Sequence, residues 1–567
     1  MSSKLSNLPE LLAPAGSFEA LVCAVKGGAD AVYLGGNEFN ARMNAKNFTE
    51  KELEKAVKYA HSYGVRLYAA VNTLIYEREF KDAMRYVAYL YSIGTDALIT
   101  ADLALCSAVA KEFPDFPIHA STQMGVHNSE AGFAMRDLGF SRMVTARELS
   151  MENIRTVCEK SPIEIEIFVH GALCVCHSGQ CLMSSVIGAR SGNRGECAQP
   201  CRMMYNGKYP LSLKDSCLAG HITDILSMNV ASLKIEGRMK SPAYVYSVTS
   251  VYRRLLDEKR NADDAEIQRL ASVFSRQGFT DGYFTNRISK KMNGIRTDAD
   301  KNTSKNQTQD VKPLCKRQGN PIAPARFTSF VRDFEIQFPK AEKHCTARFL
   351  SADGVVKHDL FDIVYLPLYK FDGKYANGVI LPPVVLDSEW DSVRYAVLQA
   401  EKNGAKHALV CNFGHISLLS GTSLTPHADY RFNLYSTASR DVLYRFGFAD
   451  ALLSPELTLP QIRDIKGDKG VVIYGRLPLM TLEKRLSETE LCDRQRAVFP
   501  VVEEAGRSIV LNSCPVYMSD KKALLDKAGI NHRHFIFSIE KKAEIKQIID
   551  GYLQGKPVNY PIKRIKG

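Results

Sequence analysis

The chain has 567 residues, of which 45% are hydrophobic and 24% are charged, as expected for a globular protein with two large domains. The net charge of +12 favours a polyanionic partner such as nucleic acid, although a basic surface kept for solubility has the same composition. No run of about 18 uncharged apolar residues occurs, and the N-terminus lacks the features of a secretory signal. We therefore expect a cytoplasmic protein without a membrane partner; nothing here indicates its oligomeric state.

The first half alternates short apolar segments with amphipathic helices. Strands are predicted at 10–15, 31–36, 66–72, 96–100, 118–122, 142–146, 165–171 and 232–237. Most are followed by a predicted helix; the clearest helices lie at 17–28, 49–64, 79–94, 130–139, 150–160 and 241–260. Eight such units in roughly 250 residues are what a (β/α)8 TIM-type barrel requires. An open doubly wound sheet has the same periodicity and is the competing fold.

The predicted barrel domain covers residues 1–285. A polar linker is expected at 286–320, and a small β-rich connector at 321–355. Residues 356–567 repeat features of the first half in the same order, and His427 matches His119, which indicates an internal duplication. The expected fold class is therefore α/β, with a second, degenerate barrel-like α/β domain after the connector.

Four of the 14 cysteines follow the seventh predicted strand, in a loop at 171–220: Cys174, Cys181, Cys197 and Cys201, with six, 15 and three residues between them. Thiolate sets of this kind bind zinc or iron–sulfur clusters. The paired C-x2-C spacings of zinc ribbons are absent, which favours a cluster, and active sites of barrels lie after the strands. Cys217 remains an alternative to Cys201. In the second half, Leu477–Met480 stand where the cysteines begin, so the chemistry is predicted in the first copy only.

The segment from Glu166 to Ser184, EIFVHGALCVCHSGQCLMS, resembles the signature of peptidase family U32. The segments ELLAPAGSFEALVCAVKGGADAVYLGG, SGNRGECAQPCR and SLKIEGRMKSPAYV are also similar to this family, and the resemblance covers roughly residues 10–290. It implies three kinds of activity: collagenase-like proteolysis, prephenate-dependent 5-hydroxylation of pyrimidines in tRNA or rRNA, and oxygen-independent ubiquinone hydroxylation. From the last branch, it implies that a 4Fe–4S cluster binds Cys174, Cys181, Cys197 and Cys201.

Several polar residues are expected near the strand ends at the barrel mouth: Asn72, His119, Gln123, Arg147, His170, Lys234, Glu236 and Arg238. Lys234 and Arg238 could hold the carboxylates of prephenate or an RNA phosphate. Glu236 could form an ion pair with either of these two side chains. His170 directly precedes the cysteine loop and is the favoured proton-transfer group. A purely structural ion-pair network would use the same residues.

The candidate reactions make different demands on the chain. Neither an HExxH sequence nor a GxSxG elbow occurs, so a peptidase would have to use His170 or His177 with Cys176 or Cys181. Hydroxylation needs a redox centre, which a cluster at the barrel mouth provides. We therefore predict an RNA hydroxylase for tRNA or rRNA, with prephenate as a possible co-substrate. The alternatives are a U32-type Cys–His peptidase and a cluster-bearing RNA-binding factor without enzymatic activity.

Overall fold

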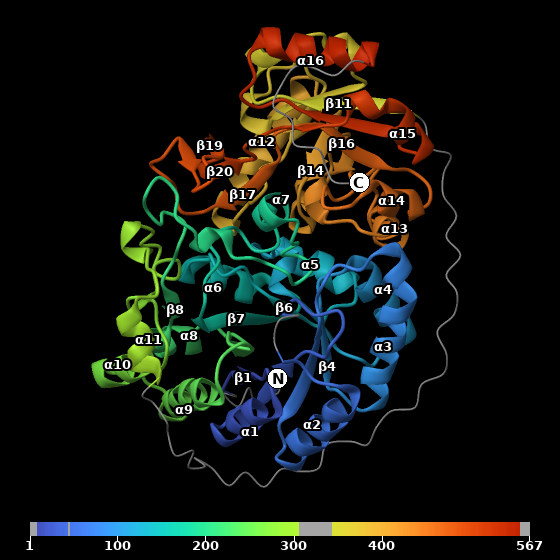
Figure 1. The fold of residues 1–567 in the computed structure, drawn as a ribbon. Coiled ribbons are helices and arrows are strands. Elements are labelled where there is room, and N and C mark those ends of the chain that lie inside the picture. The colour runs from blue at the N-terminus through green and yellow to red at the C-terminus, as the bar shows by residue number, and fades with distance from the viewer. Residues whose placement is uncertain (1–7, 43–45, 306–342, 556–567) are drawn as a thin grey trace. The chain divides into compact units, whose positions relative to one another are not determined.

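The computed structural model describes residues 8–42, 46–305 and 343–555 (Figure 1). The chain divides into two compact units, and most of the second follows residue 343. The second unit also includes the short segments Leu74–Lys81 and Asp102–Leu105. None of the helices in the described ranges has the length and apolar character that crossing a bilayer would need.

The first unit contains a closed ring of eight parallel strands, which confirms the predicted TIM-type barrel. Parallel pairings run from each strand to the next, and β9 closes the ring by pairing with both β7 and β1. All eight predicted strands are present: β1 (Glu10–Pro14), β2 (Ala31–Leu34), β3 (Arg66–Val71), β4 (Ala97–Thr100), β5 (Ile118–Ala120), β6 (Arg142–Val144), β7 (Glu164–Gly171) and β9 (Ser232–Ile235).

Helices follow the strands of this ring, and several begin at side-chain caps. Ser17, Ser150 and Ser241 each accept a hydrogen bond from a backbone N–H of the first helical turn, as N-caps do. The helices are α1 (Phe18–Lys26), α2 (Glu50–Ser62), α3 (Phe80–Ser92), α4 (Leu103–Glu112), α5 (Glu130–Asp137), α6 (Met151–Lys160), α9 (Pro242–Glu258) and α10 (Asp264–Val273).

The passage between β7 and β9 is irregular, as the cysteine spacing suggested. It contains α7 (Met183–Gly188), β8 (Asp215–Cys217) and α8 (Ile222–Leu226). Strand β8 pairs antiparallel with the end of β7, and β10 (Phe279–Thr280) pairs with β8. Residues 286–305 of the predicted linker belong to the first unit and include α11 (Asp298–Lys305). The rest of that linker lies outside the described residues.

The second unit contains another ring of parallel pairings. Its strands are β11 (His344–Arg348), β12 (Ile363–Pro367), β13 (Gly378–Ile380), β14 (His407–Val410), β15 (Thr425–Ala428), β16 (Gly470–Gly475) and β22 (His532–Ile536). At the sixth place, Ala451 and Leu452 bridge β15 to β16. Strand β11 falls where a separate connector was predicted. It is instead the first strand of this ring, because it pairs with β12 and β22.

Other elements of the second unit lie outside the ring. A four-stranded antiparallel sheet follows β16, and β21 (Val516–Tyr517) pairs antiparallel with β16. The sheet comprises β17 (Pro478–Leu482), β18 (Glu490–Cys492), β19 (Val498–Glu504) and β20 (Arg507–Leu511). The helices are α12 (Trp390–Lys402), α13 (Thr437–Arg445), α14 (Leu459–Asp464), α15 (Lys522–Lys527) and α16 (Lys542–Gln554).

Candidate functional site

The cysteine loop leaves the first barrel at Gly171, the last residue of β7. Gly171 has φ +108°, and a Cβ there would lie 2.7 Å from the carbonyl oxygen of Glu236. Glycine therefore allows β7 to end close to the backbone that follows β9. The loop starts at the C-terminal end of the strands, where barrel enzymes build their active sites.

Two charged side chains hold the loop in place. Arg202 donates from Nη2 to the carbonyl oxygen of Leu173 at 2.7 Å and from Nη1 to Oγ of Ser212 at 3.2 Å. Glu148 accepts a hydrogen bond from the backbone N–H of Ser178 at 2.7 Å, and Nδ1 of His177 lies 3.2 Å from it. Sequence reasoning missed the anchoring role of Arg202, because its carbonyl partner is 29 residues away along the chain.

The four predicted ligand thiols lie together. Burial raises the pKa of Cys201 to about 12; Arg202 opposes this shift, and the charges of Cys174, Cys181 and Cys197 add to it. All four thiols are therefore within electrostatic range of one another. Cys174 and Cys197 are exposed as residues. Desolvation by the surrounding protein nevertheless raises the pKa of both thiols.

Cys217 lies apart from this set. Its thiol is buried and lies 3.9 Å from the hydroxyl of Tyr252 on α9. Burial raises the pKa of Cys217 to about 11, and none of the four clustered cysteines contributes to that shift. Cys201, rather than Cys217, therefore lies with Cys174, Cys181 and Cys197.

An arginine-rich rim adjoins the thiols. Glu236 lies between Arg42, at 3.3 Å, and Arg147, at 2.9 Å. Burial raises the pKa of Glu236, but Arg42, Arg147 and Arg238 outweigh that effect and hold it at about 2. Arg147 also donates to the carbonyl oxygen of Ala172 at 2.7 Å. The structure thus brings the predicted Glu236 and Arg147 together and adds Arg42, which sequence reasoning missed.

Arg238 completes the rim and is buried. Its Nη1 has no hydrogen-bond partner among the described residues. Burial, followed by the charge of Arg42, lowers the pKa of Arg238 to about 10. A Cβ on Gly35 would collide with this guanidinium, so glycine at that position makes room for it. Arg238 is thus a buried cation with one donor nitrogen that lacks a hydrogen-bond partner in the described chain.

Lys234 and His119 lie inside the barrel rather than on the rim. Nζ of Lys234 is 2.7 Å from Glu166, so its charge is already paired. His119 packs edge-on against Tyr68 at 4.9 Å between ring centroids. Burial, followed by the charges of Arg142 and Lys234, holds the pKa of His119 well below its usual range. In the described part of the chain, neither side chain forms a hydrogen bond or ion pair with Glu236.

His170 faces away from the barrel interior. The register of β7 against β9 shifts by one residue between Phe168 and His170. Phe168 pairs with Lys234, and His170, two residues later, pairs with Ile235, the residue directly after Lys234. Its ring packs against Tyr244, Tyr252 and Phe279, with centroids 5.1–6.1 Å away. Burial, with a smaller effect of Lys240, lowers the pKa of His170 to about 3. The residue lies in an aromatic layer and not on the rim.

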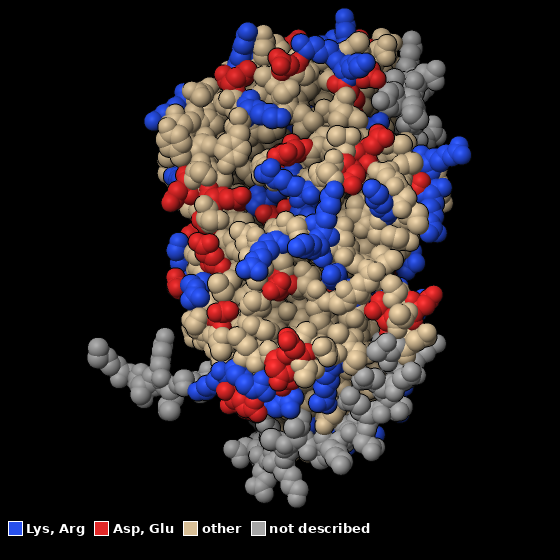
Figure 2. All heavy atoms as spheres, turned by 90° about the vertical axis from the view of Figure 1, so that its left-hand side faces the viewer, with Lys and Arg blue, Asp and Glu red and all other residues tan. Residues whose placement is uncertain are grey.

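The remaining predicted mouth residues support neighbouring loops. Oδ1 of Asn72 accepts a hydrogen bond from the backbone N–H of Ala41 at 3.0 Å, directly before Arg42. The backbone of Gln123 packs against Gly179 in the cysteine loop, where φ is +77° and no Cβ would fit. Figure 2 shows one face on which Lys and Arg side chains are interspersed with Asp and Glu.

Comparison of the sequence with known proteins finds a family and several relatives. The model of "Peptidase family U32" matches residues 16–294. The "23S rRNA 5-hydroxycytidine C2501 synthase" of Escherichia coli (strain K12) is 38% identical over 263 residues, which are 44% of this chain and 40% of that protein. The "tRNA hydroxylation protein P1" of Bacillus subtilis (strain 168) is 38% identical over 45% of this chain and 64% of that protein.

A third relative has a different name. The "Collagenase" of Porphyromonas gingivalis (strain ATCC BAA-308 / W83) is 36% identical over 48% of this chain and 73% of that protein. The matched part of this chain thus spans less than two thirds of the two hydroxylation relatives named above and nearly three quarters of the collagenase. With the closed barrel and the cysteine loop in place, the chain belongs to peptidase family U32.

Proposed function

We propose that this protein hydroxylates C5 of a pyrimidine in tRNA or rRNA, using a 4Fe–4S cluster bound by Cys174, Cys181, Cys197 and Cys201. The observation that carries the proposal is the gathering of these four thiols, from one loop, beside the arginine-rich rim at the barrel mouth. The names of two relatives support this reaction class. The net charge of +12 suits an RNA substrate.

The spacing of the cysteines along the chain supports a cluster over a single zinc ion. The paired C-x2-C spacings typical of zinc ribbons are absent from the loop sequence, and four thiolates can each bind a different iron of one cluster. When bound, such a cluster supplies one-electron transfer.

The rim residues suit the binding of an anion beside the thiols. Arg42, Arg147 and Arg238 face a single carboxylate, Glu236, which leaves two positive charges in excess. Arg238 also has a donor nitrogen without a partner in the described chain. We assign Arg238 to a carboxylate of the co-substrate, with prephenate as the candidate, or to an RNA phosphate. Glu236 holds Arg42 and Arg147 in position.

Cys–His proteolysis receives less support from the same geometry. A nucleophilic thiol needs a histidine beside it. His177 is paired with Glu148, and His170 lies among aromatic rings. Hydrolysis therefore stays the alternative that the name of one relative suggests.

The test combines cluster analysis with RNA analysis. Wild type, Cys181→Ala and the control Cys158→Ala, on α6, are purified anaerobically for iron and sulfide quantification. Each is also expressed in a deletion strain, and its RNA is analysed for 5-hydroxyuridine and 5-hydroxycytidine. We expect a cluster and one of these nucleosides with wild type and Cys158→Ala, and neither with Cys181→Ala. A cluster without any 5-hydroxypyrimidine would favour an RNA-binding factor. Proteolysis by wild type that persists after the iron is removed would favour a peptidase.

A further inference from the structure

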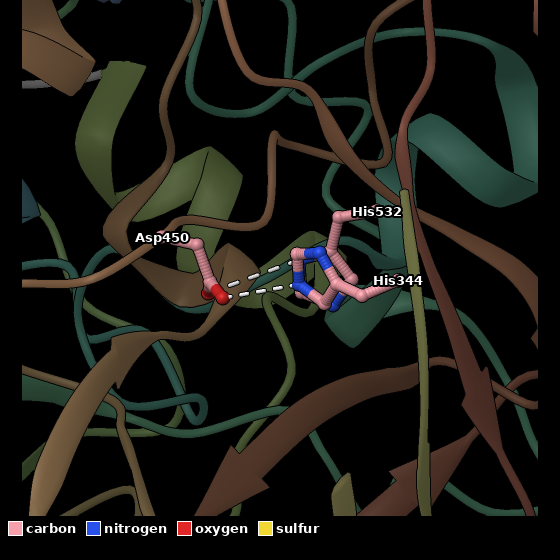
Figure 3. A group of neighbouring side chains, drawn as sticks. All are labelled: His344, Asp450 and His532. Atoms are coloured by element: carbon pink, nitrogen blue, oxygen red, sulfur yellow. Dashed lines mark hydrogen bonds and ion pairs between the residues drawn. The ribbon is translucent and has the colours of Figure 1, made fainter. Parts of the chain in front are cut away.

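Histidine and aspartate side chains gather where the strands of the second ring begin. His344 and His532 are the first residues of β11 and β22, pair in register, and stack with their ring centroids 3.9 Å apart. Figure 3 shows both rings facing the carboxylate of Asp450, which precedes the bridging residue Ala451. Nε2 of His344 lies 3.1 Å from Oδ2 of Asp450, and Nδ1 of His532 lies 3.8 Å from Oδ1.

Two atoms of this group face each other without hydrogen bonds. Nδ1 of His532 and Oδ1 of Asp450 are buried, and neither has a hydrogen-bond partner within the described ranges. Their separation of 3.8 Å is too long for a hydrogen bond but suits two ligands of one metal ion. A Cβ at Gly470 would come within 2.9 Å of Nδ1 of His532, so glycine leaves space beside that nitrogen.

The surrounding residues orient the possible ligands. Nε2 of His532 lies 2.8 Å from Oγ1 of Thr346, which fixes the ring so that Nδ1 faces Asp450. Nδ1 of His427 lies 2.8 Å from Oδ2 of Asp450, and its Nε2 lies 3.0 Å from Nδ1 of His407. Histidine ligands of metals usually have their second nitrogen fixed in this way, and carboxylate ligands are hydrogen-bonded as well.

The charges also leave a place for a cation. Within the described chain, the ion pairs of Asp450 are all with histidines, namely His344, His427 and His532. A buried carboxylate among imidazoles needs a positive charge, and a metal ion would supply it.

We propose that His344, Asp450 and His532 bind one divalent transition-metal ion of the zinc type. One ligand atom from each residue lies within 4.8 Å of the other two. Two imidazoles and a carboxylate are suitable donors for such ions. The ligands come from the first strand, the last strand and the sixth place of the ring, so the ion would hold the ring together where it closes. This inference does not depend on the RNA chemistry proposed for the first unit.

The test measures zinc binding to the full chain after dialysis against a chelator. Zinc bound per chain is determined for wild type, His344→Ala and His532→Asn, and cobalt absorption reports the type of ligand. We expect wild type to bind one equivalent more than either variant and to show cobalt d–d bands that the variants lack. Zinc should raise the thermal midpoint of wild type more than that of either variant. Thr346→Val, which frees the His532 ring, should weaken zinc binding about 10–100-fold.

The controls separate this site from the cysteine loop and from misfolding. His358→Ala changes an exposed histidine of the same unit and should bind zinc as wild type does. His344 keeps 21% of its side chain exposed, so His344→Ala is the variant least able to disturb folding. Its far-UV circular dichroism and the iron content of its cysteine loop should match wild type. Equal zinc stoichiometry and affinity in wild type and folded His344→Ala, or in folded Thr346→Val, would overturn the proposal.

Discussion

The two rings place an acidic and a basic side chain at equivalent positions, but in opposite order. In the first ring, Glu10 begins β1 and lies 2.6 Å from Arg142, which begins β6. In the second ring, His344 begins β11 and pairs with Asp450 at the sixth place. The acid and the base have thus exchanged strands. The comparison shows that a barrel of this type accepts either arrangement at this layer if the buried charges find partners.

In both rings, the seventh strand ends at a glycine with a positive φ. Gly171 ends β7 with φ +108°, and Gly475 ends β16 with φ +141°. Each lies against a backbone carbonyl of its own ring, that of Glu236 or that of Ile536. After this point the copies differ, because the first continues into the cysteine loop and the second into β17 and the antiparallel sheet. The ring is common to both copies, and the site chemistry depends on the segment that follows it.

The largest expected effect concerns the cysteines, which distinguish the first copy. Cys201→Ala should abolish cluster binding, because Cys201 lies with the other three thiols. Cys217→Ala and Cys411→Ala, the latter in the second ring, should keep wild-type iron and sulfide. Iron and sulfide per chain are measured after anaerobic reconstitution. The reverse result for Cys201 and Cys217 would exchange their assignments.

The next effect concerns the buried ion pairs of the first ring. Arg142→Met leaves Glu10 and Glu166 without this partner, and their side chains are at most 4% exposed. The free energy of unfolding should fall by about 3–5 kcal/mol, as it does when one partner of a buried pair is lost. Urea denaturation measures it. Arg136→Ala, at an exposed pair, should change it by less than about 0.5 kcal/mol. Equal losses of unfolding free energy in the two variants would mean that the buried ion pairs contribute no more than an exposed pair.

The arginine-rich rim of the first unit should make stability depend on acid pH. The pKa of Glu236 falls from 4.5 to about 2 in the folded chain, so its contribution is present above pH 4.5 and lost as the pH falls towards 2. That contribution is on the order of 3 kcal/mol. Glu236→Gln should flatten the stability profile between these pH values, whereas the exposed control Glu54→Gln should not. Denaturation at several pH values provides the measurement.

The smallest expected effect tests the shared glycines. Alanine at Gly171 or at Gly475 would meet a backbone carbonyl in a conformation that L-residues rarely adopt. Each substitution should lower the free energy of unfolding by about 1–3 kcal/mol. The control Gly220→Ala meets no atom within 4 Å and should be close to neutral. A large loss at Gly171 alone would show that the strand ends are not equivalent.

Local sequence patterns were sufficient for much of the first unit. Strands such as 31–36 and 165–171 are buried apolar runs, and capped amphipathic helices separate them, so periodicity identified them. The gathering of four cysteines was also predictable, because all four lie within 28 residues of one loop. The role of residues 343–348 could not be predicted in this way, because their partners in β22 are about 190 residues away along the chain.

The sequence by itself therefore determined the strand order, the duplication and the thiol set, all of which depend on neighbours along the chain. Only the tertiary structure decided where His170 and Lys234 point, because one shifted pairing in β7 turns His170 outward while Lys234 pairs with Glu166 inside the ring. It also brought His344, Asp450 and His532 together from three distant segments. Side-chain direction depends on strand register, and long-range pairing depends on ring closure. Neither can be predicted from a local sequence pattern.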